Sequence, residues 1–183
     1  MVDPAVAIQP VLEKLGCTPN KSSAPAKASI SCGIEFLKER RAVLPGVVPG
    51  LAKAALEAKK KGYVLAIGST YRSLQDQVDL MCDNLSEGGP PCGKGTGLAC
   101  PGPNVHTEGF AVDLHLRRNG KKVTPATGRM EPCSERTTLV KKSKELMDLN
   151  DIMFGTGWWK FCQELHHFEY TENPYNRERT KTY

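Results

Sequence analysis

Residues 110–116 read FAVDLHL, and this stretch decides how the chain is expected to fold. Apolar side chains alternate with Ala111, Asp113 and His115, which is the period of a β-strand that turns one face to a core. The other face carries a carboxylate and an imidazole, so it must face something polar. An Asn-Gly pair at 119–120 follows and predicts a hairpin that returns the chain antiparallel.

Helices and further strands are expected on both sides of this strand. Upstream, apolar residues at helical spacing predict a helix from Val48 that stops at Gly62, a buried strand over 63–67, and a second helix from Leu74. Downstream, the sequence predicts one helix from Ser134 and a last strand around 165–170. Strands mixed with helices and a hairpin predict an α+β fold, with a small, mostly antiparallel sheet flanked by helices.

The chain has 183 residues, of which 39% are hydrophobic and 25% charged, and this size suits one compact domain with some extension. We expect an N-terminal extension and linker over 1–33, in which Pro10 interrupts the first helix, then the catalytic domain over 34–176 and a charged tail over 177–183. No apolar run is long enough to cross a bilayer. The net charge of +5 comes from scattered lysines without interleaved aromatic residues, so nucleic acid is not an expected partner, whereas an anionic substrate such as cell wall is.

Seven cysteines without a C-x-x-C pair indicate disulfides in an oxidising compartment rather than a zinc ribbon. We expect pairing mainly in the Gly/Pro-rich stretch that holds Cys82, Cys92 and Cys100. The location is therefore predicted to be extracytoplasmic, in the periplasm or cell wall, or secreted or delivered. Residues 1–16 lack the basic and apolar regions of a signal peptide, so export would depend on a signal that has been removed or on another route.

Three of the four histidines lie in two short segments that also contain acids, NVHTEGFAVDL at 104–114 and QELHHFEY at 163–170. A catalytic zinc ion takes three histidine or carboxylate ligands, and a nearby carboxylate accepts the proton of the water at its open position. His106, Asp113 and His167 can be these ligands, with Glu164 as the base. Spacing alone equally allows two other histidines, His115 and His166.

Three motifs, in this order, resemble the D-alanyl-D-alanine carboxypeptidase/dipeptidase family of zinc peptidases over about residues 45–172. They are S-x-Y-R-S at 69–73 followed by Gln77, H-x-x-G-x-A-x-D at 106–113, and E-x-x-H-F-x-Y at 164–170. The resemblance implies a fold shared with the hedgehog signalling domain and peptidoglycan peptides as substrates. It also implies a role for each matched residue. The zinc ligands are His106, Asp113 and His167, Glu164 is the general base, Arg72 stabilises the oxyanion or holds substrate, and the substrate-binding residues are Tyr71, Ser73, Gln77 and Asn104.

These motifs favour a zinc-dependent peptidase of the D-alanyl-D-alanine carboxypeptidase type that acts on peptidoglycan stem peptides. Two alternatives stay open. One is a peptidoglycan endopeptidase, either a lysin or a delivered antibacterial effector that would be matched by an immunity protein. The other is a non-catalytic, hedgehog-like zinc-binding module. We expect a monomer in each case. The presence of Glu164 and Arg72 favours catalysis, because a structural zinc ion needs neither residue.

Overall fold

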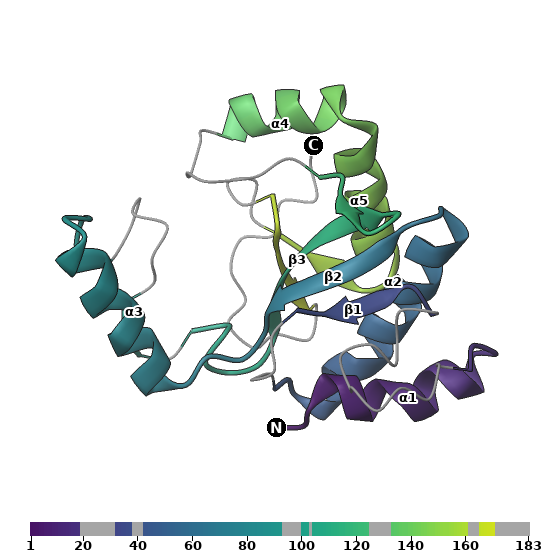
Figure 1. The fold of residues 1–183 in the computed structure, drawn as a ribbon, viewed down its shortest axis with the longest axis horizontal. Coiled ribbons are helices and arrows are strands. Elements are labelled where there is room, and N and C mark those ends of the chain that lie inside the picture. The colour runs from purple at the N-terminus through teal and green to yellow at the C-terminus, as the bar shows by residue number, and fades with distance from the viewer. Residues whose placement is uncertain are drawn as a thin grey trace.

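The computed structural model contains one sheet with helices packed on one of its faces (Figure 1). In chain order the elements are α1 (Pro4–Lys14), β1 (Ile34–Phe36), the 3-10 helix η2 (Pro45–Val47), α2 (Val48–Lys60), β2 (Val64–Ser69), α3 (Leu74–Ser86), β3 (Ala111–Arg118), β4 (Lys121–Lys122), α4 (Cys133–Lys142), α5 (Lys144–Gly155), β5 (Trp158–Trp159) and β6 (His167–Tyr170). The structure describes residues 1–18, 32–37, 42–92, 100–102, 104–124, 133–160 and 165–170, with the backbone alone for 133–137.

The sheet runs in the order β1-β2-β3-β6-β5, and the short β4 pairs with β3. The pair β1–β2 is parallel and the other pairs are antiparallel, so the predicted α+β class with a mostly antiparallel sheet is confirmed. The long strand β3 lies between β2 and β6 and therefore brings together segments that are far apart in the sequence.

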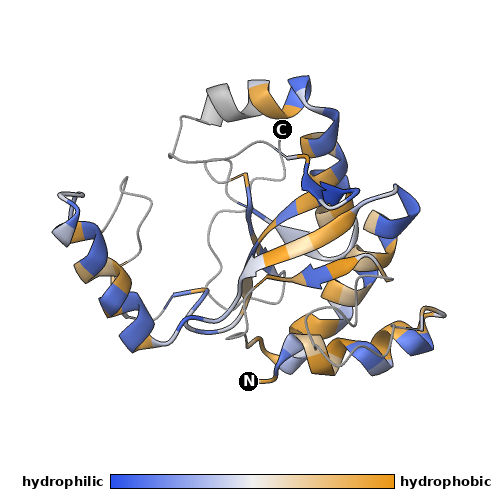
Figure 2. Ribbon diagram, in the orientation of Figure 1, coloured by the Kyte–Doolittle hydropathy of each residue, from blue (hydrophilic) through white to orange (hydrophobic). Residues whose placement is uncertain are grey.

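The two faces of the sheet differ as the alternation in β3 predicts. Val112, Leu114 and Leu116 are buried in the core, where helices α2 and α5 pack against the sheet. Asp113 and His115 point to the other face and are only partly buried. Figure 2 shows hydrophobic residues gathered in β2 and along α1 and α2. The apolar face supplies stability and leaves the opposite face for polar side chains.

The hairpin after β3 turns at Asn119 and Gly120, as predicted. Both residues have a positive φ, of 52° and 75°, which is the conformation that an Asn-Gly pair adopts at little cost. The turn pairs β4 with the end of β3.

Two predictions about the helices are wrong. Pro10 does not interrupt the first helix, since α1 continues through it to Lys14. Pro10 and Val6, whose carbonyl loses its donor, both lie on the exposed face, where solvent is near. The helix expected from Ser134 is two helices, because Ser143 ends α4 and caps α5 by accepting a hydrogen bond from the Leu146 amide at 3.3 Å.

Helix α3 stands apart from the helices that cover the sheet (Figure 1). Its apolar residues Leu74 and Leu85 are exposed, and Gln77 is its one buried residue. Gln77 is therefore enclosed by the protein and does not lie on a solvated face of the helix.

The described part of the chain contains two disulfides, Cys17–Cys32 and Cys92–Cys100. The second lies in the predicted stretch, whereas Cys82 of that stretch is an exposed free thiol. The first was not predicted and ties the end of the α1 segment to the start of β1. None of the described helices has the length and apolar character needed to cross a membrane.

Candidate metal centre

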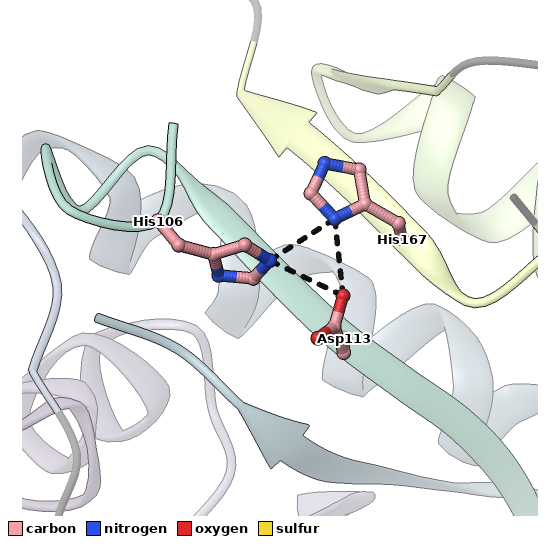
Figure 3. Close-up of side chains that lie close together, drawn as sticks. All are labelled: His106, Asp113 and His167. Carbon is pink, nitrogen blue, oxygen red and sulfur yellow. Dashed lines mark hydrogen bonds and ion pairs between the residues drawn. The ribbon is translucent and has the colours of Figure 1, made fainter. Parts of the chain in front are cut away.

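Three side chains from different parts of the chain point toward one another on the polar face of the sheet (Figure 3). Asp113 lies on β3, His167 is its cross-strand partner on β6, and His106 comes from the loop before β3. Asp113 Oδ1 lies 3.0 Å from His167 Nδ1 and 3.4 Å from His106 Nε2, and the two imidazole nitrogens are 3.1 Å apart. Strand register therefore brings together residues that are 54 positions apart in the sequence.

The loop that carries His106 is held by its own side chains. The Asn104 Oδ1 accepts hydrogen bonds from the backbone amides of His106, at 3.0 Å, and of Thr107, at 3.1 Å. Gly109 ends the loop with a φ of 78°, and a Cβ there would lie 3.2 Å from the backbone nitrogen of Leu44. Glycine is needed at this position because it turns the chain into β3 without a clash.

Hydrogen bonds on the far side of each ring fix which nitrogen of each histidine carries the proton. The Nδ1 of His106 lies 2.7 Å from the carbonyl oxygen of Thr70, and the Nε2 of His167 lies 3.3 Å from a carboxylate oxygen of Glu169. Both oxygens can only accept, so these nitrogens donate and the other nitrogen of each neutral ring keeps a lone pair. These two lone pairs and the Asp113 carboxylate point into the same small space.

This arrangement fits a metal ion well. Three acceptor atoms within hydrogen-bond distance of one another, with no proton between them, repel unless a cation lies among them. Tetrahedral zinc with ligand distances of about 2.0–2.1 Å separates its ligand atoms by about 3.3 Å, and the three distances here are 3.0, 3.1 and 3.4 Å. Two imidazoles and one carboxylate are also the donor types that zinc accepts at catalytic sites.

The charge state of Asp113 suits the role of a ligand. Burial raises the pKa of this carboxyl, but the adjacent side chains of His106 and His167 outweigh that effect and hold the pKa well below its usual value of 3.8. Asp113 is therefore a carboxylate at neutral pH.

The two other histidines left open by the sequence lie outside this group. Among the described residues, only His106, Asp113 and His167 form a cluster that could hold a metal. His115 lies two residues beyond Asp113 on the same face, and burial, with Lys122 and Arg117 nearby, lowers its pKa to about 4. His166 precedes β6, and its carbonyl accepts a hydrogen bond from the Leu114 amide at 2.9 Å.

Arg72 lies beside the metal-binding cluster, at the turn between β2 and α3. Its backbone amide donates to the carbonyl of His106 at 3.3 Å, and its Nη1 donates to the Oε1 of the buried Gln77 at 2.8 Å. The amide of Tyr71 donates to the carbonyl of Ala42 at 2.9 Å. This turn is therefore attached to the loop of His106, and Gln77 holds the guanidinium of Arg72.

Other predicted site residues have structural tasks, or lie outside what the structure describes. Ser73 caps α3 in a reciprocal capping box with Asp76. The side chain of Asn104 is engaged in the loop of His106. Glu164 lies outside the described residues.

Comparison with known proteins gives one likeness in sequence and two in structure. A stretch of 71 residues, 39% of this chain, is 38% identical to a Bacillus subtilis (strain 168) protein named "Putative carboxypeptidase YodJ". The chain covers 26% of the length of that relative. No family model matches the chain.

The first similar solved structure is a mutant of the vancomycin resistance D,D-pentapeptidase VanY from a VanB-type resistance cassette, in complex with Zn(II). It overlaps with a TM-score of 0.50 at 19% identity, over 75% of this chain and 77% of that chain. The chain shares the fold of this VanY D,D-pentapeptidase. The resemblance stated from the sequence motifs is thus confirmed in the fold. A second structure, the L-Ala D-Glu endopeptidase ChiX of Serratia marcescens, overlaps with a TM-score of 0.40 at 16% identity, over 74% of this chain and 85% of that chain.

Sequence reasoning missed two residues at this centre, Thr70 and Glu169. Thr70 acts through its backbone carbonyl, which no pattern of side chains can indicate. Glu169 was open to detection, because residues two apart on a strand share a face and Glu169 follows His167 by two.

Proposed function

We propose that this chain is a zinc-dependent peptidase that hydrolyses peptidoglycan stem peptides, with removal of a terminal D-alanine as the favoured reaction. The observation that carries the proposal is the convergence of His106 Nε2, His167 Nδ1 and Asp113 Oδ1, each with a lone pair directed into the space that a cation would occupy. The names of the similar proteins support the substrate class, since VanY is a D,D-pentapeptidase and YodJ is named a carboxypeptidase.

The proposed ligands of the zinc ion are His106, Asp113 and His167. When bound, zinc supplies Lewis-acid chemistry that polarises a carbonyl and lowers the pKa of water at the site. Glu164 accepts the proton of the attacking water and returns it to the leaving amine, as the motif at 164–170 implies.

Arg72 stabilises the negative charge that develops on the carbonyl oxygen. Two hydrogen bonds support this role, because the backbone bond to His106 attaches the turn of Arg72 to the loop of a proposed ligand and the bond to Gln77 holds the guanidinium before substrate arrives. Preorganised donors of this kind contribute about 10²–10³ in rate. A purely structural metal site would not need a guanidinium held in this way.

The proposed site of action is outside the cytoplasm, at the cell wall. Two disulfides support this location, because thiols stay reduced in the cytosol. The formal charge of +5 also suits an anionic polymer.

The test is mass spectrometry of the products that zinc-loaded protein forms from a disaccharide-pentapeptide and from cross-linked muropeptides, with and without chelator. Loss of a single alanine that chelator prevents is the expected result. Release of larger fragments would assign an endopeptidase instead. Absence of cleavage by protein that demonstrably binds zinc would contradict the peptidase proposal and leave the non-catalytic zinc module.

The variant Glu164→Gln separates catalysis from metal binding. We expect it to bind zinc with the affinity of the wild type and to lose turnover, because the amide cannot accept the proton of the attacking water. Zinc content is measured by atomic emission and turnover by alanine release. Glu108→Gln, a partly buried acid in the loop of His106, serves as the matched control and should keep both.

A further inference from the structure

Glu169 is a fully buried carboxylate on β6, two residues beyond the proposed metal ligand His167. Its cross-strand partners are Ala111 on β3 and Trp159 on β5, so it lies inside the sheet rather than at an edge. Residues two apart on a strand project from the same face. Glu169 and His167 therefore both point to the polar face, and the small side chain of Ala111 leaves room beside the carboxylate.

The contact between the two residues involves the ring nitrogen that does not face the metal-binding cluster. Glu169 Oε1 lies 3.3 Å from His167 Nε2, while His167 Nδ1 faces Asp113 Oδ1 at 3.0 Å. A carboxylate only accepts, so the proton of the neutral ring is kept on Nε2 and the lone pair on Nδ1. His106 is held in the same way by the carbonyl of Thr70, but there the acceptor is neutral backbone.

The burial of Glu169 makes its contact with His167 important. A carboxyl group removed from water is costly unless it is hydrogen-bonded, and Glu169 Oε1 faces the Nε2 of His167. Glu169 thus acts on the metal through the imidazole of His167, without touching it.

We infer that Glu169 is a positioning residue that fixes the tautomer and orientation of His167. This inference rests on the proposed function, in that it takes His106, Asp113 and His167 as zinc ligands. It does not depend on which peptide bond is cut, or on whether any is.

The first measurement is the zinc dissociation constant of the whole chain, from competition with a chromophoric chelator and with zinc alone as the probe. We expect Glu169→Ala to bind zinc about 10- to 100-fold more weakly than the wild type, the usual cost of losing an outer partner of a metal ligand. Glu169→Gln keeps the size and one acceptor oxygen, so its affinity should fall by less. The matched control is Glu35→Gln, a partly buried glutamate of the same sheet that pairs with Arg117 at 2.7 Å, and its affinity should not change.

The second measurement is the ring ¹⁵N spectrum of His167 in zinc-loaded protein, which a merely structural role of Glu169 would leave unchanged. In the wild type the proton should reside on Nε2 and exchange slowly with water. In Glu169→Gln its resonance should shift and its exchange should become faster, because the charged acceptor is gone.

Each outcome decides between the inference and its rejection. Wild-type affinity and an unchanged His167 spectrum in Glu169→Gln would overturn the role of Glu169, even if Glu169→Ala fails to fold. That result, with zinc still bound by the wild type, leaves the proposed function intact. A wild type that binds no zinc would overturn the metal centre and, with it, both proposals.

Discussion

At the scale of single residues, the metal-binding cluster is defined by the direction of lone pairs rather than by residue type. His115 lies on the same face of the sheet as Asp113, but its surroundings are Glu35, Arg117 and Lys122 instead of further ligands. Its low pKa keeps the ring neutral at physiological pH, so that it would be able to bind a metal if partners were present. What His115 lacks, among the described residues, is the pair of further ligands that would complete a cluster of three.

This difference predicts that His167→Ala lowers the zinc affinity, whereas His115→Ala leaves it unchanged. His167→Ala should reduce zinc affinity by more than the roughly 10- to 100-fold cost of losing an outer partner, because a direct ligand is lost. His115→Ala should bind one zinc ion as the wild type does. Zinc titration of the two variants checks this. Loss of zinc from His115→Ala with retention in His167→Ala would contradict the assignment of the ligands.

Residue types and their spacing were enough to predict which segments meet at the centre, but not which histidines face it. The motif at 106–113 contains both His106 and Asp113, and alternation along the strand places Asp113 on the polar face. The choice between His166 and His167 depends on the register that pairs His167 with Asp113. Register is set by long-range packing, which local pattern does not contain.

At the scale of elements, helix α3 begins at a turn that has two tasks. Ser73 caps the helix, with its Oγ accepting from the Asp76 amide at 3.0 Å, and the preceding residue is Arg72. Because most of α3 is exposed, few tertiary contacts stabilise it, and the cap accounts for a large part of its local stability.

The variant Ser73→Ala should therefore loosen α3 without unfolding the protein. Loss of such a cap costs about 1 kcal/mol, so amide hydrogen exchange in α3 should become roughly fivefold faster while exchange in β3 stays unchanged. Ser86→Ala, at the other end of the same helix, removes only a bond to the carbonyl of Asp83 and is the matched control. An unchanged exchange rate in Ser73→Ala, with weaker binding of substrate, would favour the predicted contact of Ser73 with substrate over capping.

A second element-scale prediction concerns Asp148 on α5, which ties this helix to the end of α2 and the start of β2. Burial raises the pKa of Asp148, but hydrogen bonds from Lys144, Lys61 and Tyr63 outweigh this effect and bring the pKa down to about 2. The folded pKa lies below the ordinary value of 3.8, so the stabilisation is complete above that value and is lost as the pH falls toward 2.

We therefore expect Asp148→Asn to lower the free energy of unfolding by roughly 1–2 kcal/mol at pH 7, since the two lysines are partly exposed and screened. The difference from the wild type should narrow between about pH 4 and pH 2. Urea denaturation over this range measures it. Asp83→Asn, an exposed position on α3, is the control. A difference that stays constant down to pH 2 would exclude the charge of Asp148 as its cause.

The elements with strong periodicity were predicted well, and the errors come from tertiary context. The alternation in β3, the stop at Gly62 and the Asn-Gly hairpin are local signals, and each is confirmed. The continuity of α1 through Pro10 depends on packing, since Ala5, Ile8 and Leu12 are fully buried against the rest of the core. Burial of one face stabilises the helix against a proline that, in isolation, would end it.

At the scale of the whole molecule, α1 is part of the same core as the sheet. It packs against α2, and Val2 forms a β-bridge with Val43. The domain boundary expected at residue 33 stays a prediction, and the tail at 177–183 lies outside the described residues. The helices therefore stabilise one face of the sheet together, which leaves the other face free to hold ionisable groups at the metal-binding cluster.

The disulfide Cys17–Cys32 should be a main source of stability for this arrangement. Both cysteines are buried in the core, and the bridge closes a loop of 15 residues between α1 and β1. Cross-linking a loop of this length stabilises a protein by about 3 kcal/mol in the chain-entropy model. The double variant Cys17→Ala/Cys32→Ala should lower the free energy of unfolding by about that amount in urea denaturation.

The double variant Cys92→Ala/Cys100→Ala is the matched comparison. That bridge closes a loop of eight residues. Cys100 is exposed and follows α3, the helix that stands apart from the core. Removal of this bridge should lower the free energy of unfolding of the whole protein by less than removal of Cys17–Cys32. A cross-link far from the core mainly limits local opening of the segment that it closes. Equal losses of stability in the two double variants would show that the segment from α3 to Cys100 unfolds together with the core. In that case the segment from α3 to Cys100 would be a cooperative part of the fold. The variant Ser73→Ala, which loosens α3, should then also lower the free energy of unfolding of the whole protein.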